Sequence, residues 1–505
     1  MPRLPGHPGV YVEEVPVGVR TISGVATSIA LFIGWAARGP LDRAVRVSGF
    51  ADYERHFGGL DPRTLLGHSL RHFFDNGGHD ACVLRLASTT SAEAEDNVAT
   101  ATAHAGGLAV AASSPGAWAN GVRLRISGHG AAGDDPASRR FNLEILGRTG
   151  NAAANEAFDD LSMTPGDARF APDVVNGQSG LVTLHAAGEL PVDAMELVLA
   201  DGADGTAWTA DDAAFAAALL ESFGEGMPVD RIDLFNLACV PGLTRRATIR
   251  ALQAQCRRRR AFLLVDAPQD MPVESMIEAP TDAITLAPDA RNSAIFHPWV
   301  LAEDPLTPGT VRAFPPCGFV AGVYARIDAS RGVWKAAAGT DCTLRGAAGL
   351  TQQIDDQRNG TLNPMGVNCL RRFPGRGTLI WGARTLEGHD RLGSEWKYVP
   401  VRRMALFLEE SVRRGLQWTA FEANDEPLRA QIRTTVEAFV HDLFRQGAFQ
   451  GASPREAYMV KCDRGTTTQA DVREGIVNLL LGFAPIKPGE FVMLQIPLAA
   501  ADASA

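Results

Sequence analysis

The chain has 505 residues, with 48 basic and 58 acidic side chains, a formal net charge of −10 and 46% hydrophobic residues. This composition favours folding, and it excludes a disordered chain and a basic chain that coats nucleic acid. At roughly 100–200 residues per domain, the length predicts about three domains, each able to bury its own core. The seven cysteines form no CxxC pair, so we expect a reducing cytoplasm rather than a disulfide framework or a zinc ribbon.

The first twenty residues are predicted to form an extended arm. Prolines flank a β-favouring run from Val10 to Val15 whose apolar side chains fall on both faces, and no tight turn joins this run to another. The segment lacks the cationic start and apolar run of a signal peptide, so Sec-type secretion is not expected. A second strand without a local partner is predicted near the other end, at residues 490–496. Both terminal strands are therefore expected to need a sheet elsewhere.

The next part of the chain predicts an α/β arrangement. Residues 28–86 alternate apolar strands with helices, and the helix-stopping sequence Asn76-Gly77-Gly78 precedes a last strand at residues 81–86. The clearest unit lies between Arg231 and Asp266, where we expect a strand, a helix and a second buried strand, at residues 232–240, 243–257 and 261–265. Apolar strands joined by a helix are typical of a βαβ crossover in a parallel sheet covered on both faces.

Residues 151–230 are strongly acidic. They hold fifteen acidic side chains and one basic one, so this block carries −14 and the rest of the chain sums to +4. Such a block is unsuited to a dry interface, which favours a solvent-facing insertion, although loops with acidic turns would give the same pattern. Beyond it, apolar periodicity predicts two amphipathic helices and then two strands, at residues 404–416, 428–444, 457–462 and 476–483.

Asp266 ends a strand of the predicted parallel sheet, which is where α/β enzymes place their chemistry. A hydrolase would need a base and a nucleophile beside it, and His297 and Ser293 are the nearby candidates. The sequence has no GxSxG elbow and no other serine in a recognisable catalytic setting. We therefore interpret Asp266 as the cap of a strand-to-loop turn and keep the hydrolase as an alternative.

Four further motifs are interpreted as structural features rather than as ligand-binding sites. The GxGxxG match at 128–133 precedes a strand rather than a helix, which predicts a glycine-rich hairpin. The histidines at 68, 72 and 79 and the acidic run at 201–212 lack metal-site spacing, and we interpret them as surface and turn residues. The run Arg257–Arg260 is interpreted as a solvated helix terminus rather than a nucleic-acid patch. No cofactor and no metal site are expected.

Short blocks spread along nearly the whole chain resemble the contractile phage-tail sheath proteins. They include PGVYVEEV at 8–15, PGAWAN at 115–120, AGVYAR at 321–326, WGART at 381–385 and YVPVRR at 398–403. The resemblance is poorest in the acidic region, which fits a family whose outer domains vary most. It implies an α/β multidomain fold: a central subtilisin-like α/β domain with a parallel sheet, an α+β C-terminal domain, a strand-rich outer insertion and extended terminal arms.

The resemblance also suggests boundaries for these parts. We expect an N-terminal linking arm, an α/β segment that packs with the core, an acidic outer insertion, a central sheath domain, a C-terminal domain facing an inner tube, and a linking strand with a tail, at residues 1–22, 23–105, 106–228, 229–385, 386–488 and 489–505. The terminal strands are expected to pair with the C-terminal domains of neighbours through Val10, Tyr11, Val12, Glu13, Glu14, Val15, Phe491, Val492, Met493, Leu494, Gln495 and Ile496.

The function that the resemblance implies is structural and not enzymatic. A head-to-tail contact that does not close propagates as a helix, so the chain is expected to polymerise around an inner tube and contract to drive that tube through a target envelope. The helix near residues 428–445 is similar to the family's tube-facing helix, and Arg429, Arg433 and Arg445 are its candidate tube contacts. As an alternative, these arginines simply solvate the helix.

The expected partners follow from the same resemblance. They are copies of the chain in rings expected to be hexameric, the inner tube protein, and baseplate and terminator or cap proteins, with no nucleic acid and no direct membrane insertion. Assembly is expected in the bacterial cytoplasm, as part of a phage tail or a phage-tail-like particle. The sequence leaves open whether that particle is a phage tail, a tailocin or an extracellular injection system.

Overall fold

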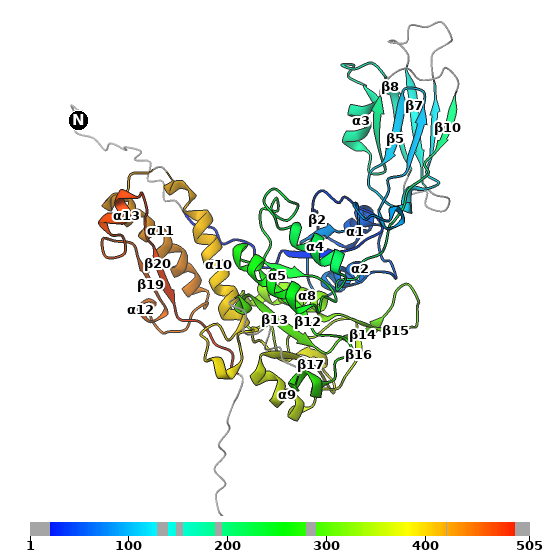
Figure 1. Cartoon of the computed structure of the whole chain (residues 1–505). Helices are drawn as coiled ribbons and strands as arrows, with labels where there is room; N and C mark the ends of the chain where they lie inside the picture. The colour runs from blue at the N-terminus through cyan, green and yellow to red at the C-terminus, as the bar shows by residue number, and fades with distance from the viewer. Residues whose placement is uncertain are drawn as a thin grey trace, which may run out of the picture. The chain divides into compact units, whose positions relative to one another are not determined.

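The computed structural model describes residues 21–128, 140–147, 155–186, 194–278, 289–420 and 422–489. Its contacts divide the chain into two compact units (Figure 1). The terminal unit comprises Met1–Val25 and Phe407–Ile486, and the central unit comprises Ala26–Leu406 and Lys487–Ala505. The linking residues expected at 10–15 and 491–496 lie outside the described residues. Within the described part of the chain, no helix has the length and apolar character needed to cross a membrane.

An eight-stranded sheet organises the central unit. Its order is β18-β17-β13-β12-β11-β1-β3-β2, with bounds β1 Ala30–Gly34, β2 Val45–Val47, β3 Ala81–Arg85, β11 Leu237–Cys239, β12 Phe262–Asp266, β13 Ser293–His297, β17 Val367–Phe373 and β18 Gly377–Ile380. The six inner strands are parallel, and β2 and β18 are antiparallel edges. Strands β1, β3, β12 and β13 are buried along their whole length, as a sheet covered on both faces requires.

Helices cover both faces of this sheet. One core contains residues of α1 Phe50–Phe57, α2 Leu66–Asp75 and α8 Pro316–Arg331. The core on the other face contains residues of α4 Ala213–Glu221, α5 Arg246–Arg258, α6 Val273–Glu278 and α9 Asp356–Leu362. Strand β1 lies between β3 and β11, so the connections leave β1 toward one edge and β11 toward the other. The central unit is therefore doubly wound, with its switch point between β1 and β11.

The βαβ unit predicted between Arg231 and Asp266 is confirmed, because β11, α5 and β12 follow in order and the two strands are parallel. Its first strand is shorter than the apolar run suggested. The side chain of Asn236 accepts the backbone N–H of Ile29 at 3.0 Å, just before β11 begins. This side-chain bond adds to the backbone bonds that Asn236 makes with Ile29 and Phe262.

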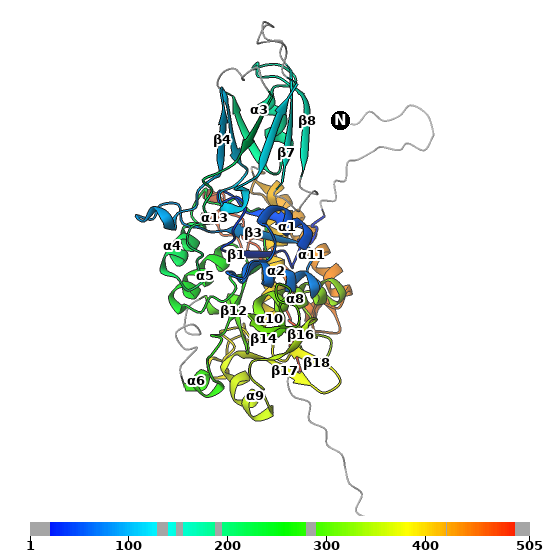
Figure 2. The same cartoon turned by 90° about the vertical axis from the view of Figure 1, so that its right-hand side faces the viewer.

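Helices α2 and α8 pack closely against each other (Figure 2). A Cβ atom added at Gly318 would lie 2.2 Å from the carbonyl oxygen of Ser69, and one added at Gly322 would lie 2.4 Å from that of Phe73. Glycine is therefore required at both positions for the helices to approach. Beside them, a three-stranded sheet is formed by β14 Val300–Glu303, β15 Val311–Phe314 and β16 Ala347–Leu350.

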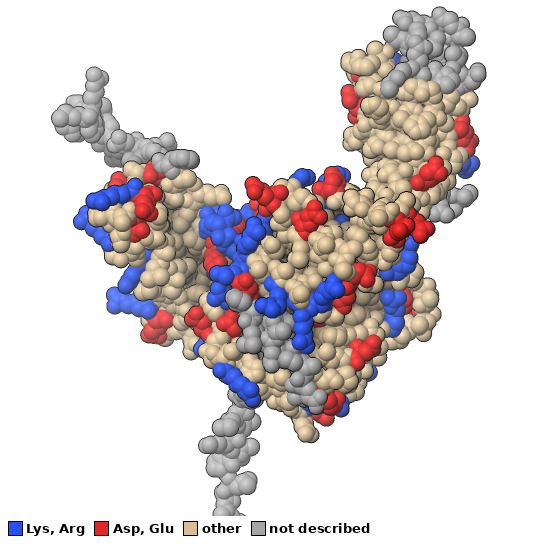
Figure 3. Space-filling view, viewed as in Figure 1, with Lys and Arg blue, Asp and Glu red and all other residues tan. Residues whose placement is uncertain are grey.

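Residues 101–199 build a third core around two antiparallel sheets. One sheet contains β4 Thr102–Ala105, β5 Leu108–Ala112 and β9 Val182–Ala186, and the other contains β6 Arg123–Ser127, β7 Phe141–Leu146, β8 Glu156–Leu161 and β10 Met195–Val198, with α3 Ala171–Gln178 beside them. Strands β6 and β7, which flank the GxGxxG match, pair antiparallel as a hairpin requires, while residues 129–133 of the match lie outside the described residues. The visible face of this insertion shows more acidic than basic side chains (Figure 3).

The terminal unit combines helices with one small sheet. It contains most of α10 Val399–Gly415, followed by α11 Glu426–Arg445, α12 Pro454–Ala457, β19 Tyr458–Lys461, α13 Gln469–Arg473 and β20 Leu480–Phe483. The carboxylate of Asp425 accepts the N–H of Leu428 at 2.9 Å and caps α11. Both predicted amphipathic helices are present. Short 3-10 helices also occur along the chain, at Ala94–Asp96, Ala117–Ala119, Ala290–Asn292, Asn363–Met365, Asp390–Leu392 and Gln417–Thr419.

Candidate functional site

The two strands of the terminal unit form a sheet with one covered face and one open face. Tyr458 pairs with Phe483 and Lys461 with Leu480, in antiparallel register. Because side chains alternate along a strand, Val460, which is 8% exposed, points to the side of α11, while Met459 and Leu480 point outward. Met459 and Leu480 are 42% and 49% exposed. The outer face, which also carries the exposed Lys461 opposite Leu480, is therefore uncovered within the described residues.

Among the described residues, both edges of this sheet are open along the strands. The described residues contain only β19 and β20 in this sheet. The N–H of Ala484 donates to the carbonyl of Ala457 at 2.8 Å, and the alternation of an antiparallel ladder then turns the backbone groups of Tyr458 and Val460 away from β20. Just beyond β20, the N–H of Gln450 donates to the carbonyl of Ala484. The sequence predicted these strands but gave no sign that they would pair only with each other.

The three arginines predicted as tube contacts have different environments on α11. Arg429 was expected on the polar face, and this is wrong: it is 6% exposed, because its guanidinium pairs with Glu426 at 3.4 Å and donates to Asn424 Oδ1 at 2.7 Å. Arg433 is half-buried and donates to the carbonyl of Cys462 at 3.3 Å. Arg445 is exposed in the last turn. Arg433 and Arg445 thus remain the accessible pair.

Asp266 holds two loops at the carboxyl end of β12. Its carboxylate accepts the N–H of Gly242 at 3.0 Å and the N–H of Cys317, at the start of α8, at 2.8 Å. The side chain is 2% exposed, and this burial raises the pKa of Asp266 to about 6 against the lowering effect of both hydrogen bonds. The capping interpretation of Asp266 is confirmed.

The residues of the alternative hydrolase do not assemble into a triad. His297 and Ser293 occupy opposite ends of β13, which at about 3.3 Å per residue separates them by roughly 13 Å. Ser293 instead donates to Ala290 O and accepts from Gln253 Nε2. His297 is fully buried and neither ring nitrogen has a hydrogen-bond partner among the described residues, and burial lowers its pKa to about 4.

His68 and His72 were expected on the surface, and this is wrong. They are 1% and 8% exposed, because His68 stacks on Phe314 and His72 stacks on Phe319, at centroid distances of 5.1 and 3.9 Å. Burial lowers the pKa of His72 to about 3. The acidic run fits the turn interpretation: the carboxylate of Asp211 accepts the backbone N–H groups of Thr244 and Arg245 at the start of α5.

The run of arginines at 257–260 ends α5 as predicted. The helix finishes at Arg258, and Arg257 pairs with Asp289 at 2.9 Å. Arg259 lies 3.5 Å from the carboxylate of Asp230 and stacks over Phe235. Arg257 and Arg259 are therefore held by neighbouring residues. Among the described residues, no cluster of three or more His, Cys, Asp or Glu side chains is arranged to bind a metal ion.

Comparisons with known proteins match both units. The family described as phage tail sheath protein central domain matches residues 232–386, and the family described as phage tail sheath C-terminal domain matches residues 393–499. A tail sheath protein of Vibrio phage KVP40 is 22% identical over 193 residues, which are 38% of this chain and 27% of that relative. The match therefore spans only about a quarter of the length of this curated relative.

Solved structures extend the likeness to nearly the whole chain. The helical sheath of the anti-feeding prophage in its contracted state has a TM-score of 0.60 at 22% identity, covering 98% of this chain and 99% of that one. The contracted sheath complex of the extracellular contractile injection system PVC gives 0.59 at 20%, covering 98% of each. A sheath tail protein from Listeria innocua gives 0.61 at 14%, covering 92% of this chain and 96% of that one. These likenesses concern the fold.

Proposed function

This chain belongs to the contractile tail sheath family, and we propose that it is the structural subunit that polymerises helically around an inner tube and contracts to drive the tube through a target envelope. The observation that carries this proposal is the two-stranded sheet of the terminal unit. Its edges are open along both strands, and the sequence predicts two terminal strands that lack a partner of their own. Two donors and two acceptor edges are what a continuous linkage between copies requires.

The linkage would form by strand addition. Residues 10–15 and 491–496 of neighbouring copies would each extend the β19–β20 sheet, using backbone hydrogen bonds such as those offered by Tyr458 and Val460. Each such bond contributes about 1 kcal/mol net, so an arm of six residues is held by several bonds at once. A two-stranded sheet is marginal by itself, and three or four strands are much more stable. Polymerisation would therefore complete the fold of the terminal unit.

Contraction would keep these links and exchange the other contacts. In this mechanism the extended sheath is a kinetic trap assembled on the tube, and the trigger lets subunits rotate into a lattice with more buried contact. Arg433 and Arg445 on α11 are the proposed contacts to the inner tube. Exposed ion pairs contribute about 0–1 kcal/mol each, which would permit release. No cofactor enters this mechanism.

The remaining proposals concern the surroundings of the subunit. The central unit would correspond to a subtilisin-like domain that does no hydrolysis, supported by the separation of Ser293 and His297 by roughly 13 Å along β13. Copies would stack as hexameric rings, with baseplate and terminator or cap proteins at the ends. Assembly would take place in the bacterial cytoplasm, before the particle, a phage tail or a phage-tail-like machine, acts.

Deleting residues 1–20 tests the proposal. We expect the full chain to form rods or cogwheel-shaped tubes by negative-stain electron microscopy, and the truncated chain to remain monomeric. The central core keeps all of its residues in this variant, so circular dichroism should show a folded protein.

A second truncation serves as the matched control. Removing residues 497–505 shortens the other end but retains the predicted strand 490–496, so it should leave assembly intact. If the chain without residues 1–20 still forms tubes of normal length, strand donation by the N-terminal arm does not join these subunits. If the full chain stays monomeric at high concentration, the sheath function itself fails.

A further inference from the structure

A groove runs along the carboxyl edge of the central sheet. Two cavities of about 180 and 540 Å³ adjoin there, and both are lined by Asp211, Gly242 and Trp299. The smaller cavity lies beside the ends of β1 and β11, which is the switch point where doubly wound folds bind their ligands. The sheath function proposed above makes no use of this groove.

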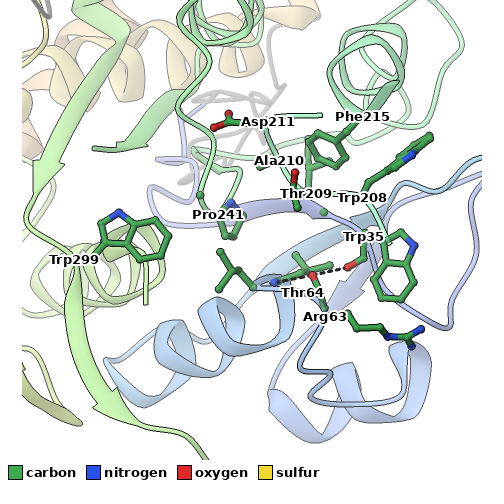
Figure 4. Close-up of a pocket in the computed structure, with 15 residues that line it drawn as sticks. Trp35, Arg63, Thr64, Trp208, Thr209, Ala210, Asp211, Phe215, Pro241 and Trp299 are labelled. Carbon is green, nitrogen blue, oxygen red and sulfur yellow. Dashed lines mark hydrogen bonds between the residues drawn. The ribbon is translucent and has the colours of Figure 1, made fainter. Parts of the chain in front are cut away.

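The walls of the groove are aromatic and contain several prolines. Trp35, Trp208 and Trp299, three of the eight tryptophans of the chain, line the smaller cavity, with Trp299 on the opposite side from Trp35 and Trp208 (Figure 4). Trp35 and Trp299 are 1% and 6% exposed, so the half-buried Trp208 offers the accessible ring. Pro241 lies beside them, and Pro268 and Pro272 line the larger cavity. At about 180 Å³, the smaller cavity is below the range of 300–1,000 Å³ that is usual for small-molecule pockets. The larger cavity, at about 540 Å³, is within that range but is open to solvent and lined by two prolines. An open groove with prolines and one accessible tryptophan ring suits an extended peptide, above all one in polyproline II conformation.

The charge of the groove is negative. Asp211 and Asp270 line it, and both residues are exposed. The one basic side chain among the lining residues, Arg63, is already paired with Asp61 at 2.7 Å and Asp204 at 3.0 Å. The helix N-terminus after β11, which could otherwise bind an anion, is capped by the carboxylate of Asp211. A basic ligand therefore fits this groove and a phosphate does not.

One segment of this chain has the matching chemistry. Residues 2–8, which lie outside the described residues, read PRLPGHP, with proline at every third position. A polyproline II helix has three residues per turn, so this spacing places Pro2, Pro5 and Pro8 along one face. Residues 1–8 contain Arg3 and His7 but no acidic side chain. By contrast, the C-terminal residues 497–505 contain one acidic and no basic side chain and one proline.

We infer that the carboxyl-edge groove of one subunit binds residues 2–8 of an adjacent copy. This inference rests on the proposed function, in which residues 10–15 join a neighbour and carry the preceding residues with them. At about 3.1 Å per residue, residues 2–8 span roughly 22 Å. Each N-terminal arm would thus be attached twice. Residues 10–15 would add a strand to a terminal unit, and residues 2–8 would bind the groove of a central unit.

Disulfide trapping in the full chain tests the inference. All seven native cysteines are buried, which keeps background cross-linking low. Thr209 is exposed and lines the smaller cavity, so the variant Leu4→Cys/Thr209→Cys should form a ladder of dimers and larger species on mild oxidation of assembled rods. The control Leu4→Cys/Thr183→Cys, with an exposed residue of β9, should yield at least tenfold less.

Two further variants test the chemistry of recognition. Replacing Pro2, Pro5 and Pro8 with alanine in the Leu4→Cys/Thr209→Cys chain should lower the ladder at least threefold, and it changes no residue of the described fold. Asp270→Arg should do the same, whereas Glu93→Arg, at another exposed acidic residue, should leave the ladder unchanged.

The outcomes separate this inference from the function on which it rests. Rods without any cross-link overturn the groove assignment and leave the sheath function standing. Rods with only an intramolecular cross-link overturn the assignment to an adjacent copy. A ladder of equal yield in both cysteine pairs shows unspecific trapping and overturns the inference as well. Absence of rods together with absence of a ladder overturns both proposals.

Discussion

The two sheets that lie in separate units of this chain satisfy their backbones in different ways. The central sheet has eight strands, helices on both faces and antiparallel edge strands. The sheet of the terminal unit has two strands of four residues and an outer face that exposes Met459 and Leu480. The first is complete within one chain, whereas the second is marginal until something is added. One polypeptide thus contains one sheet that is complete by itself and one sheet that further strands would stabilise.

The completeness of the central unit depends on buried charges as well as apolar contacts, and breaking one of them should have the largest effect. Arg403 pairs with Asp328 at 2.5 Å, with side chains only 4% and 3% exposed, and stacks over Tyr324. Arg403→Met leaves the carboxylate buried without its cation, which costs about 3–5 kcal/mol. We expect the midpoint of urea unfolding, followed by circular dichroism, to fall accordingly.

A double variant provides the control for this prediction. Arg403→Met/Asp328→Asn removes both charges, so it should recover a large part of the lost stability. If the single variant unfolds at the same urea concentration as the natural chain, the ion pair does not support the central unit. If the double variant is no more stable than the single one, the loss comes from the packing of the arginine stem instead.

A fall in pH should destabilise the central unit, with an effect of intermediate size. The unfolded chain protonates His72 near its ordinary pKa of 6.5, but the folded chain protonates it only near 3. The stability contributed by neutral His72 is therefore present above about pH 6.5 and is lost as the pH falls toward 3. Lowering the pH to 5 should cost the natural chain about 2 kcal/mol at this residue.

The variant His72→Leu isolates this contribution, because leucine fills the site without titrating. Comparing urea midpoints at pH 8 and pH 5, the gap between natural chain and variant should shift by the same 2 kcal/mol in favour of the variant. Asp266, whose raised pKa favours folding at low pH, is common to both chains and cancels in the comparison. An equal loss in both chains would show that His72 does not titrate during unfolding.

The sequence predicted those elements whose signal is local. Strand β12 and helix α5 were predictable because their apolar periodicity matches the faces that they bury. The burial of His72 was not, because its partner Phe319 is 247 positions away and nothing local marks the contact. Likewise Arg429 was misplaced, since its pairing with Asn424 and Glu426 depends on how the chain enters α11. Local patterns thus predicted elements, whereas the burial of polar side chains depended on a long-range contact for His72 and on the conformation of the residues just before α11 for Arg429.

The same distinction between local signals and packing in space applies to the candidate site. Strands near residues 458–461 and 480–483 were predicted from their composition, and the terminal strands were recognised as lacking local partners. Nothing in the sequence indicated that β19 would pair only with β20, because edge status depends on the absence of other strands in space. The acceptor edges could therefore not be predicted, although the donors could be.

The smallest effect on stability is expected on the polar face of the terminal unit. Arg445 is exposed, and within the described residues no carboxylate lies close enough to form an ion pair with it. Arg445→Ala removes only a favourable interaction with the end of the α11 dipole, so the free energy of unfolding should fall by less than about 0.5 kcal/mol. Assembly on the inner tube protein should nevertheless weaken, and shorter rods in electron micrographs would measure it.

Arg429→Ala is the matched control on the same helix. It removes a buried side chain with two polar partners, so it should destabilise the terminal unit by about 1–3 kcal/mol and affect assembly only through that loss. Arg445→Ala should thus change binding at nearly constant stability, whereas Arg429→Ala should change stability. If Arg445→Ala alters neither rod length nor the salt dependence of assembly, this arginine only solvates its helix, and the inner tube is bound by another surface.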